Sequence, residues 1–252
     1  MATVIAFANQ KGGVGKTTLA VQLAYYLHLR KNKKVLFVDM DAQGSATETL
    51  TVQGEYHGTL SAELFSEEDI EIHVQKTERG IDLIGATADA DEYEAETVPL
   101  ELAPRPAELL KDTFAKYDYV IIDCPPTLGR RLVACLIMAQ YVVTPITFTG
   151  YSVSGLTKLN EQIENIKHRA NRRLKFLGII VNGYTKTATQ KRLMDEVQEM
   201  VGDLMFKSIV CRREPLGNVA AGYPITAARN GQSANREITA LFEEMLTRIA
   251  KS

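Results

Sequence analysis

The stretch that decides the fold is "VIAFANQKGGVGKTTLA", residues 4 to 20. It opens with an apolar run typical of a buried strand, continues through a glycine-rich loop, and ends where apolar residues begin to repeat at helical spacing. A strand, a glycine loop and a helix in this order let backbone N–H groups and the positive end of the helix hold a phosphate. The alternative is a glycine-rich turn with incidental lysines. The predicted binding loop consists of Gly12, Gly13, Val14 and Gly15.

The loop departs from the common pattern G-x-x-x-x-G-K-[ST] at its first position, where this chain has Gln10. Lys16 fills the lysine position and is predicted to neutralise the β and γ phosphates of a nucleotide. The Thr17 hydroxyl is predicted to ligate Mg²⁺, and Thr18 to donate to the α phosphate. A second lysine, Lys11, is not needed for a phosphate that Lys16 already faces.

Carboxylates at the ends of apolar strands complete the predicted site. Asp123 closes the run "YVIIDC" (119 to 124), and the prolines behind it stop the strand, so a water-mediated Mg²⁺ contact fits it. Asp39 and Asp41 flank Met40 and point the same way if their strand persists, and one of them could orient the attacking water. The alternative for these aspartates is a role in capping turns.

The nucleotide is more consistent with ATP than with GTP, because the guanine-reading pattern N-K-x-D is missing from the sequence. Asn182 follows a strand-like run and has both a donor and an acceptor, with which it could read the edge of adenine. A turn-forming asparagine explains this residue equally well.

Strand-like and helical patterns alternate along the whole chain, and the strands are apolar throughout, as in a parallel sheet covered on both faces. We therefore expect an α/β fold with a mostly parallel twisted sheet and helices on both faces, formed by residues 1 to 252 as a single domain. Further strands are predicted at 34–41, 81–86, 119–124, 141–148, 174–181 and 205–210. Further helices are predicted near 61–70, 104–117, 129–139, 153–168, 187–202 and 233–250.

Charge is distributed unevenly along the chain. Residues 1 to 149 hold 13 Lys and Arg against 21 Asp and Glu, whereas residues 150 to 252 hold 16 against 10. The basic C-terminal part could bind a polyanion. Cys124, Cys135 and Cys211 show no metal or disulfide spacing and are expected in the core. No apolar run approaches the length of a membrane span and no leader precedes the first strand, so we expect a cytoplasmic protein.

Three motifs together resemble the ParA/MinD family of P-loop ATPases, and most closely its short ParA-type partition ATPases. They are "KGGVGKTT" (11 to 18), "VLFVDMDAQGSAT" (35 to 47) and "YVIIDCPPTLG" (119 to 129). The resemblance implies that Lys11 reaches across an ATP-bound homodimer to the partner's phosphates. It also implies that Asp41 is required for hydrolysis and that Asp123 is the carboxylate near Mg²⁺.

The resemblance further implies a switch: ATP closes the dimer, the dimer binds DNA without reading its sequence, and hydrolysis releases it. The motifs contain no arginine finger, so hydrolysis is expected to need a ParB-like partner, and the ATP state is expected on the nucleoid. The expected DNA contacts are Lys191, Arg192, Arg212 and Arg213. Further basic candidates are Lys167, Arg169, Arg172, Arg173, Lys175 and Lys186. Any one of these basic residues, the first four included, could equally belong to a solvated helix end.

Two departures from the family weaken a direct transfer of roles. Thr149 stands where many relatives carry an acidic residue that contacts ribose across the dimer, and "IVCRRE" (209 to 214) replaces the usual I-P-R-N.

Two other classes of protein fit the sequence less well. A MinD-like membrane regulator needs an amphipathic basic C-terminal helix, but the apolar stripe of residues 238 to 249 instead predicts a helix packed on the core. A metabolic P-loop enzyme related to nitrogenase reductase needs cysteines placed for an iron–sulfur cluster, and this spacing is missing from the sequence. No motif identifies the cargo: a plasmid, an integrative element, a chromosome or a protein assembly fits equally.

Overall fold

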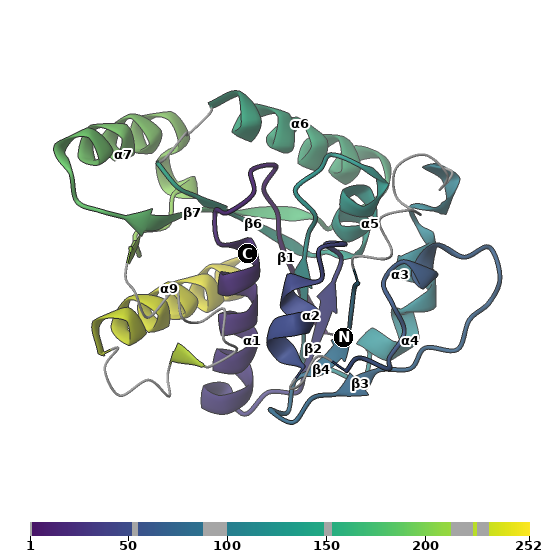
Figure 1. Cartoon of the computed structure of the whole chain (residues 1–252). Coiled ribbons are helices and arrows are strands. Elements are labelled where there is room, and N and C mark those ends of the chain that lie inside the picture. Colours follow the sequence, from purple (N-terminus) through teal and green to yellow (C-terminus); the bar gives the residue numbers. More distant parts are fainter. Residues whose placement is uncertain (1, 52–54, 88–99, 149–152, 213–223, 226–231) are drawn as a thin grey trace.

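The computed structural model describes residues 2–51, 55–87, 100–148, 153–212, 224–225 and 232–252 (Figure 1). Their strands form an eight-stranded sheet in the order β3-β4-β2-β5-β1-β6-β7-β8. The central strands are β1 (Thr3–Phe7), β2 (Val35–Asp39), β5 (Tyr119–Asp123), β6 (Tyr141–Ile146) and β7 (Lys175–Tyr184). The outer strands are β3 (Gln75–Lys76), β4 (Asp82–Ile84) and β8 (Val210–Cys211).

All neighbouring strands are parallel except β3 and β4, which pair antiparallel. The central strands are apolar on both faces because helices cover both sides of the sheet. The register places Asp39 at the end of β2 directly beside Asp123 at the end of β5. This order confirms the predicted, mostly parallel sheet and brings the carboxyl ends of β1, β2 and β5 together.

The helices form two layers (Figure 1). On one face, α1 (Lys16–Lys31), α2 (Ser45–Leu50) and α9 (Gln232–Lys251) pack against the sheet. The other face is covered by α3 (Arg105–Leu109), α4 (Lys111–Phe114), α5 (Arg130–Met138) and α6 (Val153–Arg169). Helix α7 (Ala188–Val201) packs on a smaller cluster beside β7. Short 3-10 turns cover Glu63–Phe65, Leu100–Leu102 and Gly202–Leu204.

Helix α9 buries the apolar stripe that the sequence placed on it. Ile238, Leu241, Phe242 and Met245 are at most 2% exposed, and Ile249 packs at the margin of the same cluster. The prediction of a core-packing final helix is confirmed, because the apolar face is taken up by the protein's own core.

Three predicted elements differ from the structure. The helix expected near 61–70 is only the turn Glu63–Phe65, and the backbone just before it pairs with the end of β4 through the hydrogen bond from Ser61 N to the Gly85 carbonyl. The helix expected over 104–117 is interrupted at Leu110, between α3 and α4. Helix α2 and strand β3 were not predicted.

The strand expected over 205–210 is reduced to Val210–Cys211. Met205 and Phe206 still pair with Ile179 of β7, but side chains of α9 bind the other backbone groups here. Glu244 accepts the N–H groups of Lys207 and Ser208 at 3.0 and 2.8 Å, and the Arg248 guanidinium donates to the Met205 carbonyl at 2.7 Å. Since these backbone groups already have partners, no ladder is needed here.

The cysteines agree in part with the expectation that they lie in the core: Cys124 and Cys135 are buried, and Cys211 is half-buried. Within the described ranges, no cluster of three or more His, Cys, Asp and Glu residues could hold a metal ion. None of the described helices combines the length and the apolar character needed to cross a membrane.

Candidate nucleotide site

The glycine loop connects the carboxyl end of β1 to the start of α1, as the sequence predicts. Gly13 and Gly15 adopt left-handed backbone angles, with φ of 72° and 91°, which residues with a side chain rarely adopt. Among the described residues, no atom lies within 4 Å of the point where a Cβ would stand on Gly12 or Gly13. The loop therefore presents its backbone to open space next to the N-terminus of α1, where an anion is favoured.

Asn9 fixes the beginning of the loop, a role that sequence reasoning missed. Its Nδ2 donates to the Pro145 carbonyl of β6 at 2.6 Å, and its Oδ1 accepts the Lys11 N–H at 2.9 Å. The signal in the sequence was a polar residue directly after an apolar strand. Asn9 thus ties the backbone that carries the half-buried Lys11 to the central sheet.

Asn182 braces the other end of the loop from β7. Its Nδ2 donates to the Val14 carbonyl at 2.8 Å, and a Cβ on Gly15 would stand 2.2 Å from the same nitrogen. Glycine at position 15 is therefore favoured by its backbone angle, and any side chain there would displace the Asn182 amide. The adenine-reading role of Asn182 stays a prediction, since in this structure its donor holds the loop.

Lys16 and Thr17 open α1 beside the end of β5. The Lys16 side chain is only 6% exposed, and the Thr17 hydroxyl donates to Asp123 Oδ2 at 2.6 Å. Thr18, in the same first turn, is half-buried. The residues predicted to contact Mg²⁺, Thr17 and Asp123, therefore lie in direct contact with each other.

Asp123 is fully buried, and its Oδ1 has no hydrogen-bond partner among the described residues. Burial raises the pKa of Asp123 well above its usual value and the neighbouring Asp39 raises it further, whereas the hydrogen bond from Thr17 and the charge of Lys16 lower it. An orphaned carboxylate oxygen next to a threonine hydroxyl is a donor set that Mg²⁺ prefers. The residues present thus fit a magnesium ion with its water shell.

Asp39 lies at the centre of a buried network. Its Oδ2 accepts from the Thr47 N–H and hydroxyl at 2.9 and 2.8 Å, and its Oδ1 accepts the Asp41 N–H at 3.2 Å. The Thr47 hydroxyl in turn accepts the Ala86 N–H at 2.8 Å. Burial raises the pKa of Asp39 to about 6, against these hydrogen bonds, which lower it. Asp39 thereby fixes the turn that carries Asp41.

Asp41 lies beyond the end of β2, which stops at Asp39. The alternation that would aim both carboxylates the same way does not extend this far, because the strand does not persist. Asp41 is half-buried, and its Oδ1 accepts the Gln43 N–H at 3.2 Å. Its role in hydrolysis stays a prediction.

The predicted DNA contacts divide between two edges of the sheet. Lys191 and Arg192 are exposed in the first turns of α7, and Arg212 follows β8, with its N–H bonded to the Tyr184 carbonyl at 2.9 Å. These residues, here called the carboxyl-edge cations, lie at the same edge as the glycine loop. Arg172 and Arg173 instead precede β7 and so lie at the opposite edge. Arg213 and Thr149 lie outside the described residues.

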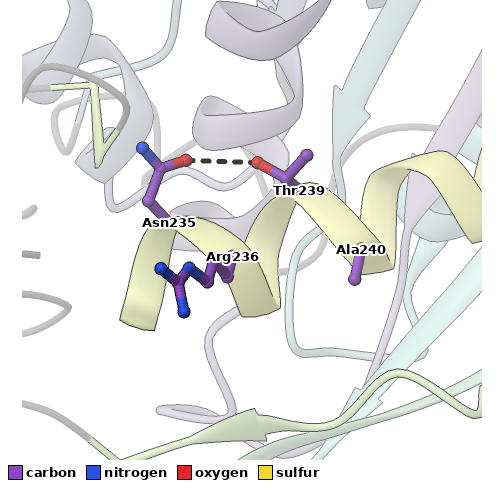
Figure 2. A pocket seen from close by; sticks show the side chains of 4 residues that line it. All are labelled: Asn235, Arg236, Thr239 and Ala240. Carbon is purple, nitrogen blue, oxygen red and sulfur yellow. Dashed lines mark hydrogen bonds between the residues drawn. The ribbon is translucent and has the colours of Figure 1, made fainter. Parts of the chain in front are cut away.

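A hollow lies on the first turns of α9 (Figure 2). It is lined by Asn235, Arg236, Thr239 and Ala240, and the Thr239 hydroxyl donates to Asn235 Oδ1 at 3.1 Å. Arg236 supplies its only charged group among these residues. The hollow contains none of the predicted nucleotide-binding residues.

A family model described as an AAA domain matches residues 2–176. The chromosome-partitioning ATPase Soj of Thermus thermophilus is 35% identical over 258 residues, which cover 98% of this chain and 97% of that protein. The chain belongs to the ParA/Soj family of partition ATPases. The similarity therefore extends over nearly the whole chain and is not limited to the three motifs that build the site.

Solved structures agree with the P-loop ATPase fold. A plasmid partition protein of Borrelia burgdorferi bound to AMPPNP has a TM-score of 0.76 at 26% identity, covering 100% of this chain and 99% of that chain. A cobyrinic acid a,c-diamide synthase of Mycobacterium smegmatis bound to ADP and magnesium also has a TM-score of 0.76, at 27% identity, covering 88% of this chain and 91% of that chain. The cofactors predicted for this chain, ATP and Mg²⁺, agree with the ligands of these two structures.

Proposed function

We propose that this chain is an ATP-driven partition switch, which binds Mg²⁺ and ATP, closes into a homodimer, binds DNA without reading sequence, and hydrolyses ATP when a ParB-like partner stimulates it. The observation that carries the proposal is the contact between Thr17 and Asp123, with a buried carboxylate oxygen left over beside an open glycine loop. This arrangement suits a nucleotide with its cation.

Each residue of the site has a part in this cycle. The backbone N–H groups of the glycine loop hold the phosphates, and Lys16, held nearly buried at the start of α1, offsets their charge. Thr17 and Asp123 hold Mg²⁺, which when bound neutralises charge on the β and γ phosphates. Asp41, held by the turn that Asp39 fixes, orients the attacking water.

Lys11 explains why ATP promotes a dimer. It lies on the loop that Asn9 ties to the sheet, so its backbone is held by Asn9 and β6. If it pairs with the γ phosphate bound by a second copy, it loses that partner on hydrolysis, and the dimer opens. The nucleotide state thereby biases association.

DNA binding is assigned to the carboxyl-edge cations, together with Arg213. They lie at the edge where the two copies are expected to meet, so the dimer joins two sets of cations into one surface. Affinity for phosphates then rises on dimerisation, because two weak contacts act together.

A MinD-like membrane regulator is the alternative class. The apolar face of α9 packs in the core, with Phe242 and Met245 fully buried, and this leaves no apolar stripe on that helix for a bilayer. We therefore propose that the ATP state binds DNA rather than a membrane. The protein would then be cytoplasmic, and associated with the nucleoid in its ATP state.

The proposal is tested with the variant Lys191→Gln, Arg192→Gln, Arg212→Gln. We expect ATP binding to stay as in the wild type and the ATP-dependent gain in affinity for a random duplex to fall at least tenfold, because phosphate contacts are lost. Fluorescence anisotropy with a labelled duplex, with ADP and with a non-hydrolysable ATP analogue, measures both states. Wild-type protein that binds no duplex with the analogue would refute the DNA part of the proposal.

A further inference from the structure

Tyr56 lies behind the turn that carries Asp41, in a part of the molecule to which the proposed cycle assigns no role. Its hydroxyl donates to the Thr59 carbonyl at 2.7 Å and accepts the Gly85 N–H at 2.7 Å. Gly85 directly follows β4, and its carbonyl accepts the Ser61 N–H at 2.7 Å. Both backbone polar groups of Gly85 are therefore held by the segment that begins with Tyr56.

Gly85 fills the space between the Tyr56 ring and Thr47 of α2. A Cβ on this glycine would stand 2.8 Å from Tyr56 Cζ and 2.9 Å from the Thr47 methyl group, so a side chain has no room there. The next N–H along the chain, that of Ala86, donates to the Thr47 hydroxyl at 2.8 Å. The backbone at the end of β4 is thus in contact with Tyr56 and with Thr47.

Thr47 connects this backbone to the residue predicted to act in hydrolysis. Its hydroxyl and N–H donate to Asp39 Oδ2 at 2.8 and 2.9 Å, and Asp39 Oδ1 accepts the Asp41 N–H at 3.2 Å. The Gly44 N–H closes the turn on the Asp41 carbonyl at 2.9 Å. Gly44 has a φ of 62°, and a Cβ there would stand 2.7 Å from the Ala86 carbonyl oxygen. The turn therefore rests on Ala86 as well as on Asp39.

This chain of contacts is buried over most of its length. Thr47, Asp39 and Ala86 are at most 5% exposed, and Gly85 is buried. Burial raises the pKa of the Tyr56 hydroxyl to about 12, so this group keeps its proton at neutral pH and donates. Because a closely packed interior transmits strain from one group to the next, a shift of Gly85 also displaces the turn that rests on its neighbour.

We propose that Tyr56 is a positioning residue for ATP hydrolysis, which acts on the Asp41 turn through the end of β4 and Thr47. The inference rests on the proposed function, in which Asp41 orients the attacking water. The orienting group must be placed accurately, because an error of about 1 Å can slow a reaction about a hundredfold. The hydrogen bonds of the Tyr56 hydroxyl go to backbone groups beside β4, so we expect it to affect the rate of hydrolysis and not the binding of nucleotide.

A purely structural role for the hydroxyl is the competing explanation, and Tyr117 provides the comparison. The Tyr117 hydroxyl donates to Asp82 Oδ2 at 2.8 Å, and Asp82 begins β4. Both tyrosines are half-buried, and they hold opposite ends of the same strand. The register of β4 on β2 pairs Asp82 with Leu36, far along the strand from the Asp41 turn. Tyr117→Phe therefore removes a comparable hydroxyl outside the route to Asp41.

The test compares the hydrolysis of ATP with Mg²⁺ at a fixed protein concentration. Single-turnover rates, kcat and KM are measured for the wild type and for Tyr56→Phe, Thr47→Val, the double variant Tyr56→Phe, Thr47→Val and the control Tyr117→Phe. Tyr56→Phe keeps the ring that packs on Gly85. Denaturant unfolding and ADP titration check that each variant folds and binds nucleotide.

We expect kcat of Tyr56→Phe to fall by about fivefold or more, with KM and the Kd for ADP unchanged, because only the placement of Asp41 is altered. Tyr117→Phe should lose stability to a similar extent and keep the kcat of the wild type. Thr47→Val should also lower kcat. The double variant should be no slower than the slower single variant, since both changes break the same route.

Four results would count against the inference alone: an unchanged kcat in Tyr56→Phe, a change confined to KM, an equal fall in Tyr56→Phe and Tyr117→Phe, or effects that multiply in the double variant. In each case the proposed function would stand, because the wild type still hydrolyses ATP. A wild type that binds ATP with Mg²⁺ and does not hydrolyse it would overturn both the inference and the proposed function.

Discussion

At the scale of single residues, the site depends on polar groups that the fold buries beside a phosphate loop. Asp39 and Asp123 stand side by side at strand ends, and both are fully buried. Thr17 and Thr47 each donate a hydroxyl to one of these carboxylates. The two carboxylates therefore have different surroundings. Asp123, bound by Thr17, lies beside the nucleotide loop, whereas Asp39, bound by Thr47, holds the turn that carries Asp41.

Thr17 tests the magnesium assignment. We expect Thr17→Ala to lose most of the increase in ADP affinity that Mg²⁺ gives the wild type, at least tenfold, because a ligand hydroxyl is removed. The conservative control Thr17→Ser keeps the hydroxyl and should keep the increase. Isothermal titration calorimetry with Mg²⁺ and with a chelator measures it. A Thr17→Ala variant with the same Mg²⁺ dependence as the wild type would contradict the assignment.

Asp39 predicts a pH dependence of stability in the nucleotide-free, metal-free protein. Its pKa is raised from 3.8 to about 6 on folding, so at pH values between these two the carboxyl of Asp39 binds a proton more tightly in the folded state than in the unfolded state. The free energy of unfolding therefore falls as pH rises through this window, by at most about 3 kcal/mol, and levels off above it. In Asp39→Asn this fall should be smaller than in the wild type.

Denaturant unfolding at several pH values between about 4 and 7 measures the effect. Asp112→Asn, which changes an exposed carboxylate on α4, serves as the control and should follow the wild type. If the free energy of unfolding of Asp39→Asn falls with rising pH as steeply as that of the wild type, Asp39 is not the group responsible.

At the scale of elements, the central strands and the long helices could be predicted from the sequence because their apolar runs are read directly as burial. Two predictions were wrong where partners distant in sequence decide the backbone. The stretch 205–210 has strand-like composition, but Glu244 and Arg248 of α9 take its hydrogen bonds. The stretch near 61–70 has helical composition, but at its start Ser61 pairs with Gly85 at the end of β4. Neither partner is visible from local pattern.

The same limit applies to the site. The residues of the glycine loop, Thr17 and Asp123 are placed together as predicted, because each follows a strand of the same sheet. The braces formed by Asn9 and Asn182 were not predicted, since they depend on which strands lie beside β1. The order of strands, rather than any local motif, puts β6 and β7 next to the loop.

Asn182 offers a direct choice between bracing the loop and reading adenine. If it braces the loop, Asn182→Ala should weaken ADP and GDP binding by the same factor, about fivefold, which corresponds to one lost hydrogen bond of about 1 kcal/mol. If it reads adenine, only ADP binding should weaken, and the preference for ADP over GDP should become smaller. Competition binding with both nucleotides decides, and Asn160→Ala on the exposed side of α6 is the control.

At the scale of the whole molecule, the parallel sheet gives its two edges different residues. The carboxyl ends of the strands gather the nucleotide loop, the buried carboxylates and the carboxyl-edge cations. The amino ends lie instead beside Arg172 and Arg173, which precede β7. Uneven charge could be read from the sequence, but its division between two edges needed the strand order, because Arg172 and Arg192 are close in sequence and lie at opposite edges.

The central claim is that Lys11 serves a second copy of the chain, and Lys11→Ala tests it most directly. With Mg²⁺ and a non-hydrolysable ATP analogue, we expect the wild type to sediment as a dimer and Lys11→Ala to bind the analogue yet remain a monomer. Analytical ultracentrifugation gives the mass, and fluorescent nucleotide titration confirms that the variant is loaded. A loaded Lys11→Ala protein that dimerises as readily as the wild type would contradict the account.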